Sequence, residues 1–146
     1  MREGDIMLQA IYTNQDNQVL IKLQNEEKIA PLSTTLEVLF ALCLQYGATY
    51  EGRRSATIKI LNVKQKVPIL LSKQILLFPT HSPKQKECVW INYYAIASIE
   101  RYHHETLILL KDTSKLIVKS SIRSIKEQIK RCFTYDLYLT QQEQSN

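Results

Sequence analysis

Side chains able to hold a metal or attack a substrate are few and poorly spaced in this 146-residue chain. Its three histidines and three cysteines show no C-x-x-C or H-x-x-x-H spacing, whereas a structural zinc site needs four converging ligands. The adjacent His103 and His104 would point to opposite faces of a strand or share a turn. No G-x-S-x-G motif or glycine-rich phosphate loop occurs. We therefore predict no metal, no cofactor and no catalytic centre, hence a protein that is not an enzyme.

The cysteines fit structural roles better than catalytic ones. Cys43 falls on the apolar face of a predicted helix. Cys88 lies two residues before Trp90, so the side chains of Cys88 and Trp90 point to the same side of a strand. An odd number of widely spaced cysteines is typical of reduced thiols in a cytoplasmic protein. The N-terminus does not resemble a signal peptide, and no apolar run approaches the ~18 residues of a membrane span. We expect a soluble, cytoplasmic domain.

Basic side chains are the more informative group. The net charge is +5, and it is unevenly distributed: residues 51–75 hold six basic and one acidic side chain, and residues 101–131 hold eight and three. If these two basic segments are neighbours in space, they form one positive face suited to nucleic acid. Alternatively, the lysines only solvate sheet edges and guard them against aggregation.

Two short stretches could carry such contacts. In "YGATYEGRRSAT" (46–57), two glycines permit positive φ, which predicts a loop that presents Arg53 and Arg54 to phosphates or to a narrow minor groove. The alternative is a structural turn in which the arginines pair with Glu51 or a helix C-terminus. In "PTHSPKQKE" (79–87), Lys84 and Lys86 lie on a connection longer than a hairpin needs, unless its prolines merely stiffen a surface crossover.

The elements that must position these residues follow from hydrophobic periodicity. Residues 7–12 and 18–23 alternate around a polar turn and predict a hairpin. Residues 34–47 predict a helix with a Thr34–Glu37 capping box and Gly47 at its end. Strands are expected at 56–63, 67–71, 74–78, 88–91, 95–100, 106–110 and 115–119. A helix is expected at 122–133, a packed segment at 133–139 and a frayed end at 141–146. This pattern predicts one α+β domain of about eight mostly antiparallel strands and two helices.

Three landmarks occur in order and in register. "CLQYGATYEGRRSAT" (43–57), "KVPILLSKQILLFPTHSP" (66–83) and "CVWINYYAI" (88–96) together resemble the ComK family of competence transcription factors, with a looser match through "SIRSIKEQIKR" (121–131). The resemblance implies a DNA-binding domain over residues 1–131, followed by a short tail at 132–146.

The resemblance also implies a function. Members of this family are transcriptional regulators that bind paired A/T-rich boxes in double-stranded DNA, largely through the minor groove, as homo-oligomers. They activate DNA-uptake genes, contact RNA polymerase, and are controlled by an adaptor of a Clp protease. This chain ends earlier than the longer members, so a shortened regulator that binds DNA but activates poorly is an alternative.

A second, looser similarity is to LytTR-type DNA-binding domains, carried by "WINYYAIASIE" (90–100) and "LIVKSSIRSIKEQI" (116–129). Such domains contact DNA from loops between strands. That geometry would place Lys84 and Lys86 on one face with Lys119 and Arg123. A different class of function also stays open, a protein-interaction module that uses exposed edge strands or the tyrosine-rich stretch 133–139 and touches no DNA.

Overall fold

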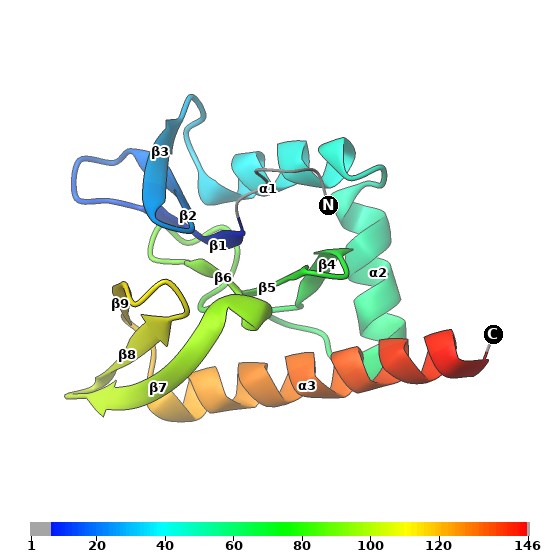
Figure 1. Cartoon of the computed structure of the whole chain (residues 1–146). Helices are drawn as coiled ribbons and strands as arrows, with labels where there is room; N and C mark the ends of the chain where they lie inside the picture. Colours follow the sequence, from blue (N-terminus) through cyan, green and yellow to red (C-terminus); the bar gives the residue numbers. More distant parts are fainter. Residues whose placement is uncertain (1–6, 146) are drawn as a thin grey trace.

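The structure is a computed structural model that describes residues 7–145 (Figure 1). The first six residues, which we expected not to form a signal peptide, lie outside the described part. The predicted α+β class is confirmed, with two antiparallel sheets ordered β3-β2-β1-β6-β5-β4 and β7-β8-β9. The strands are β1 Leu8–Thr13, β2 Val19–Leu23, β3 Glu26–Ala30, β4 Ile69–Ser72, β5 Ile75–Pro79, β6 Trp90–Asn92, β7 Ile96–Tyr102, β8 Glu105–Leu110 and β9 Lys115–Val118.

The described residues form three α-helices, α1 Thr35–Gln45, α2 Tyr50–Leu61 and α3 Ile122–Ser145, and one 3-10 turn, η1 Tyr93–Ala95. The predicted capping box begins α1, because Thr34 Oγ1 accepts the Glu37 N–H at 3.1 Å and Glu37 Oε1 accepts the Thr34 N–H at 3.0 Å. Gly47 follows the helix with a φ of 94°, a conformation that glycine adopts at little cost.

Helix α2 corrects the prediction of a loop at 46–57 and a strand at 56–63. Thr49 begins the helix by accepting the Gly52 N–H at 3.1 Å, and Asn62 ends it in the left-handed conformation. The β-branched residues of this stretch favour a strand locally, but packing against β4, α1 and α3 decides in favour of the helix. Arg53 and Arg54 therefore lie on a helix and not on a loop.

Helix α3 is longer than predicted and passes the expected boundary between residues 131 and 132 without a break. Its buried side, Ile125, Gln128, Cys132 and Tyr135, keeps a spacing of three and four residues. Tyr135 and Leu139 pack against the core, as expected for a packed segment at 133–139. Residues 141–145 continue the helix, which corrects the prediction of a frayed end there.

Two hydrophobic layers lie on opposite faces of the six-stranded sheet (Figure 1). Helix α1 covers one face, where Leu39 and Cys43 pack on Ile11 and Trp90. The second sheet and α3 cover the other face, and α2 stands at the β4 edge between the layers. None of the described helices is long and apolar enough to cross a membrane.

Candidate nucleic-acid interface

The loop of residues 80–89 joins two paired strands and is held by hydrogen bonds and buried side chains. β5 and β6 are antiparallel neighbours, with Pro79 opposite Trp90. Thr80 closes the base of the loop, since its N–H donates to Val89 O at 3.0 Å and its Oγ1 accepts the Val89 N–H at 2.9 Å. Buried Cys88 and Trp90 anchor the end of the loop, while Lys84 and Lys86 are exposed along it.

His81 fixes this loop to the turn between β9 and α3. Its Nε2 lies 2.9 Å from Lys119 O and its Nδ1 lies 2.7 Å from Thr80 Oγ1. Because a carbonyl only accepts, Nε2 carries the hydrogen, and the Thr80 hydroxyl donates to Nδ1. This contact, which sequence analysis did not anticipate, holds Lys119 beside the loop.

Two clefts meet at the loop, and we call them together the basic groove. Lys84 and Lys86 line a cleft of about 390 Å³ that lies against the N-terminal end of α1. Lys86 and Lys119 line a second cleft of about 520 Å³, beside β9. Thr13, at the end of β1, lines both clefts. Three lysines from two distant segments therefore share one hollow surface.

Helix α3 carries a second group of basic side chains on its exposed side. Arg123, Lys126 and Lys130 are exposed and lie at spacings of three and four residues, so they follow one side of the helix. At a rise of about 1.5 Å per residue, they span about 10 Å. Arg131 instead donates to Gln65 O at 2.8 Å, where the helix meets the loop after α2. Lys126 and Lys130 are exposed basic residues on the same side of α3 as Arg123, but sequence analysis did not name them as DNA contacts.

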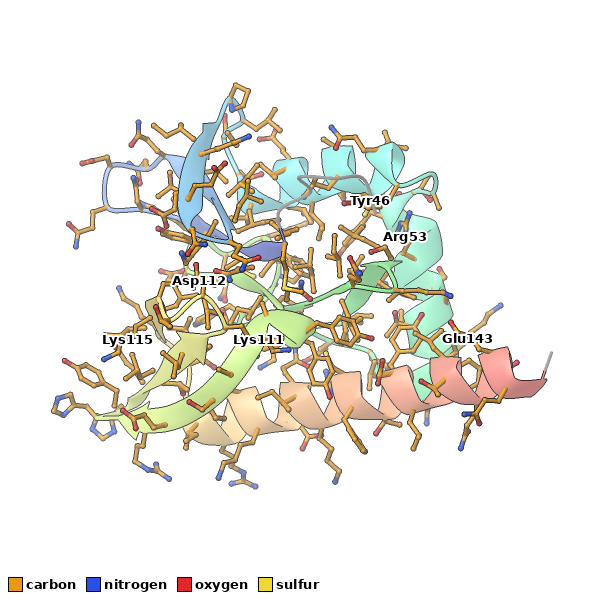
Figure 2. The ribbon with its side chains drawn as sticks, in the orientation of Figure 1. Tyr46, Arg53, Lys111, Asp112, Lys115 and Glu143 are labelled. Carbon is orange, nitrogen blue, oxygen red and sulfur yellow. The ribbon has the colours of Figure 1, made fainter. Side chains whose placement is uncertain are left out.

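The two predicted arginines lie elsewhere. Figure 2 shows Arg53 and Tyr46 at the corner between α1 and α2, across the molecule from Lys115 at the start of β9. Arg54, next to it on α2, donates to Lys64 O at 3.4 Å. The structure therefore does not bring Arg53 and Arg54 together with the lysines of the basic groove.

The Arg53 guanidinium is engaged with the protein itself. It donates to five backbone carbonyls at the C-terminal end of α1 and on β4. These acceptors are Cys43 (3.3 Å), Tyr46 (2.9 Å), Ala48 (3.2 Å), Leu70 (2.6 Å) and Leu71 (3.3 Å). Sequence analysis gave pairing with a helix C-terminus as the alternative to DNA contact, and Arg53 makes this pairing with α1. Arg53 also covers the outer edge of β4.

Acidic and thiol groups near the groove limit its chemistry. Glu87 lines the second cleft and opposes the lysine charges locally.

Burial raises the pKa of the Cys88 thiol to about 11, although hydrogen bonds with the backbone and the charge of the nearby Lys66 lower it. The thiol is therefore protonated at neutral pH. Within residues 7–145, no three metal-ligating side chains lie close enough to hold an ion. The groove offers cations, amides and hydroxyls, which suit phosphates and base edges.

Comparisons with known proteins agree on one family. A family model described as ComK protein matches residues 1–144. The chain is 26% identical over 99 residues to the competence transcription factor of Bacillus subtilis (strain 168), a match that covers 66% of this chain. The matched region spans about half, 52%, of the length of that relative. No solved structure matches.

Proposed function

The chain belongs to the ComK protein family, and from this premise we propose that it is a competence transcriptional regulator that binds A/T-rich double-stranded DNA. The observation that carries the proposal is the basic groove, where Lys84, Lys86 and Lys119 converge. The relative's description as a competence transcription factor supplies the kind of regulation.

The lysines of the groove contact phosphates in this proposal, and Arg123 and the two lysines after it on α3 extend the contacts along the backbone. Such contacts fix the register of protein on DNA, and they carry no base preference directly. Preference for A/T-rich boxes comes largely from the minor groove, whose narrow A-tract form attracts basic side chains. Because the Arg53 guanidinium is engaged with backbone carbonyls, Arg123 takes over the minor-groove contact that we first expected of Arg53 and Arg54.

A pair of boxes requires two bound subunits, since the minor groove distinguishes little beyond A·T from G·C. The exposed apolar residues Phe133 (57%) and Leu137 (47%) lie one turn apart on α3 and favour a protein contact there. We assign this stretch to self-association. RNA polymerase and a Clp-protease adaptor, which the family resemblance implies, are further partners in this proposal. The same residues support the second candidate function, an interaction module that acts without DNA.

Fluorescence anisotropy separates these functions. A labelled duplex with two A/T boxes is titrated against a G/C duplex of equal length, over a series of salt concentrations. The proposal predicts tighter binding to the A/T duplex and a log–log salt slope near −5, from about six neutralised phosphates. Equal binding to both duplexes would contradict the A/T preference, and absence of binding at moderate salt would favour the interaction module.

A further inference from the structure

The turn between β1 and β2 lies between the two clefts of the basic groove. Thr13 begins the turn and lines both clefts, Gln15 lines the cleft that contains Lys119, and Asn17 lines the cleft that contains Lys84. A turn with lysines on both sides approaches whatever the lysines bind. Sequence analysis treated this stretch only as a hairpin turn.

The turn is rigid, and it leaves two amide groups free. Asn14 Oδ1 accepts the N–H groups of Asp16 and Gln18, both at 2.9 Å, and its Nδ2 donates to Gln18 Oε1 at 3.1 Å. Asn17 adopts a φ of 61°, which holds the turn in a left-handed conformation. In the part of the chain that the structure describes, the exposed side-chain amides of Gln15 and Asn17 have no hydrogen-bond partner.

Free amides suit one base edge in particular. Asn and Gln side chains bind adenine by a pair of hydrogen bonds, to N6 and N7, in the major groove. Two features of this turn favour that groove. A two-stranded turn fits the major groove, about 12 Å wide, better than the minor groove, about 6 Å wide. The Asp16 carboxylate at the tip is also repelled by the strong negative potential of a narrow A-tract minor groove.

We propose that the β1–β2 turn enters the major groove and that Gln15 and Asn17 recognise adenine there, while the flanking lysines hold the phosphates. This inference rests on the proposed DNA binding and adds a source of base preference to it. Minor-groove contacts by Arg123 are compatible with it, because the two grooves alternate along one side of a duplex. The turn then adds a base preference to that of the minor groove, and the lysines contribute affinity.

The test compares the double variant Gln15→Ala/Asn17→Gly with the wild-type protein. Glycine tolerates the left-handed conformation at position 17, so the turn is preserved while the amide is lost. Gln24→Ala/Asn25→Gly is the matched control, because it makes the same changes in the β2–β3 turn, where Asn25 has a φ of 65°. Circular dichroism and thermal unfolding verify that both variants are folded.

Base analogues identify the groove. Inosine·C pairs present the minor-groove edge of A·T with the major-groove edge of G·C, and 2-aminoadenine·T pairs present the opposite combination. We expect the turn variant to lose about tenfold in affinity on A·T and 2-aminoadenine·T boxes, little on inosine·C or G·C boxes, and to keep the wild-type salt slope. The control variant should match the wild-type protein on all four duplexes.

The opposite outcomes overturn the inference separately from the proposed function. If the wild-type protein prefers A/T DNA and the turn variant keeps that preference, the turn does not recognise bases, and the proposed function stands. If the loss occurs on inosine·C instead of 2-aminoadenine·T boxes, the amides act in the minor groove and the major-groove assignment is wrong. If the wild-type protein binds no duplex, the proposed function fails, and this inference fails with it.

Discussion

The Asp112 carboxylate lies 3.6 Å from the Lys22 ammonium, and this ion pair joins the two sheets of the fold. Asp112 belongs to the turn between β8 and β9, and Lys22 to β2, with side chains only 2% and 10% exposed. Asp112 also accepts the N–H groups of Asn25, at 2.9 Å, and Ser114, at 3.0 Å. The turn is centrally placed between the sheets in Figure 2.

This contact predicts how stability changes in acid. Burial alone would raise the pKa of Asp112, but hydrogen bonds from Ser114 and Asn25 and the charge of Lys22 outweigh burial and lower it. A lowered pKa in the folded state stabilises the protein above the unfolded-state value of about 4, and this stabilisation is lost as the pH falls further. Asp112→Asn, which leaves Lys22 without its charged partner, should cost about 3 kcal/mol of unfolding free energy at pH 7.

Urea unfolding from pH 7 to pH 3 checks this prediction. The difference between the wild-type and Asp112→Asn free energies should begin to shrink below about pH 4, because the unfolded chain then takes up a proton that the folded carboxylate, with its lowered pKa, does not. A constant difference between them at every pH would show that Asp112 acts through neutral hydrogen bonds alone.

A second prediction concerns Arg53, whose guanidinium donates to five carbonyls. Arg53→Lys keeps the charge but cannot reproduce the planar arrangement of donors, so it should lower the unfolding free energy by about 3 kcal/mol. Arg54→Lys is the matched control, with a single long contact to Lys64 O, and should cost less than about 0.5 kcal/mol. Thermal and urea unfolding give both values. Equal stabilities for the two variants would contradict the structural role of Arg53.

A third prediction concerns Asn92, which is completely buried at the end of β6. Its Nδ2 donates to Leu8 O at 2.7 Å and Gln74 O at 3.1 Å, and its Oδ1 accepts the N–H groups of Leu76 at 3.1 Å and Tyr94 at 3.2 Å. Asn92→Ala leaves these buried backbone groups unpaired and should cost about 4 kcal/mol, measured by urea unfolding.

The exposed Gln74 provides the comparison, since Gln74→Ala keeps the carbonyl that Asn92 binds and should cost less than about 0.5 kcal/mol. A small effect of Asn92→Ala would mean that water replaces the lost amide, so that the site is more open than its complete burial indicates.

A fourth prediction concerns the cysteines, all three of which are buried. Burial raises the pKa of Cys43, Cys88 and Cys132, so each is a protonated thiol at pH 8. Iodoacetamide at pH 8 should therefore label the native protein at least about 100-fold more slowly than the urea-unfolded protein, as measured by mass spectrometry. A cysteine labelled equally fast in both states would be exposed through local opening of the fold.

Local signals in the sequence predicted much of this fold. The Thr34–Glu37 capping box and the alternating strands depend on neighbouring residues, and they lie where their patterns indicate. Helix α2 was missed because its β-branched residues favour a strand, and only contacts with β4 and α3 reveal the helix. The edge strand β3 was missed because four of its five residues are exposed and it lacks an alternating apolar pattern.

In the candidate site too, local sequence predicted some features and tertiary contacts decided the others. Lys84, Lys86 and Lys119 were named from charge and resemblance, but their common surface depends on the His81 contact between residues 38 apart, which no local pattern encodes. Arg53 has the sequence context of a ligand-binding arginine, and its acceptors on β4 lie 17 and 18 residues away. Sequence identifies which side chains are cationic, whereas tertiary structure decides which remain available.

The salt dependence of DNA binding by a groove variant tests the central claim most directly. Lys84→Gln, Lys86→Gln and Lys119→Gln are combined and compared with a control in which the exposed Lys28, Lys59 and Lys64 are changed to Gln, so both variants lose three charges. On an A/T duplex, the groove variant should bind roughly 100-fold more weakly at about 0.15 M salt, with a salt slope shallower by about 3. The control should remain within about threefold of the wild-type protein. Equal losses in the two variants would show that DNA responds only to net charge, and the basic groove would not be the interface.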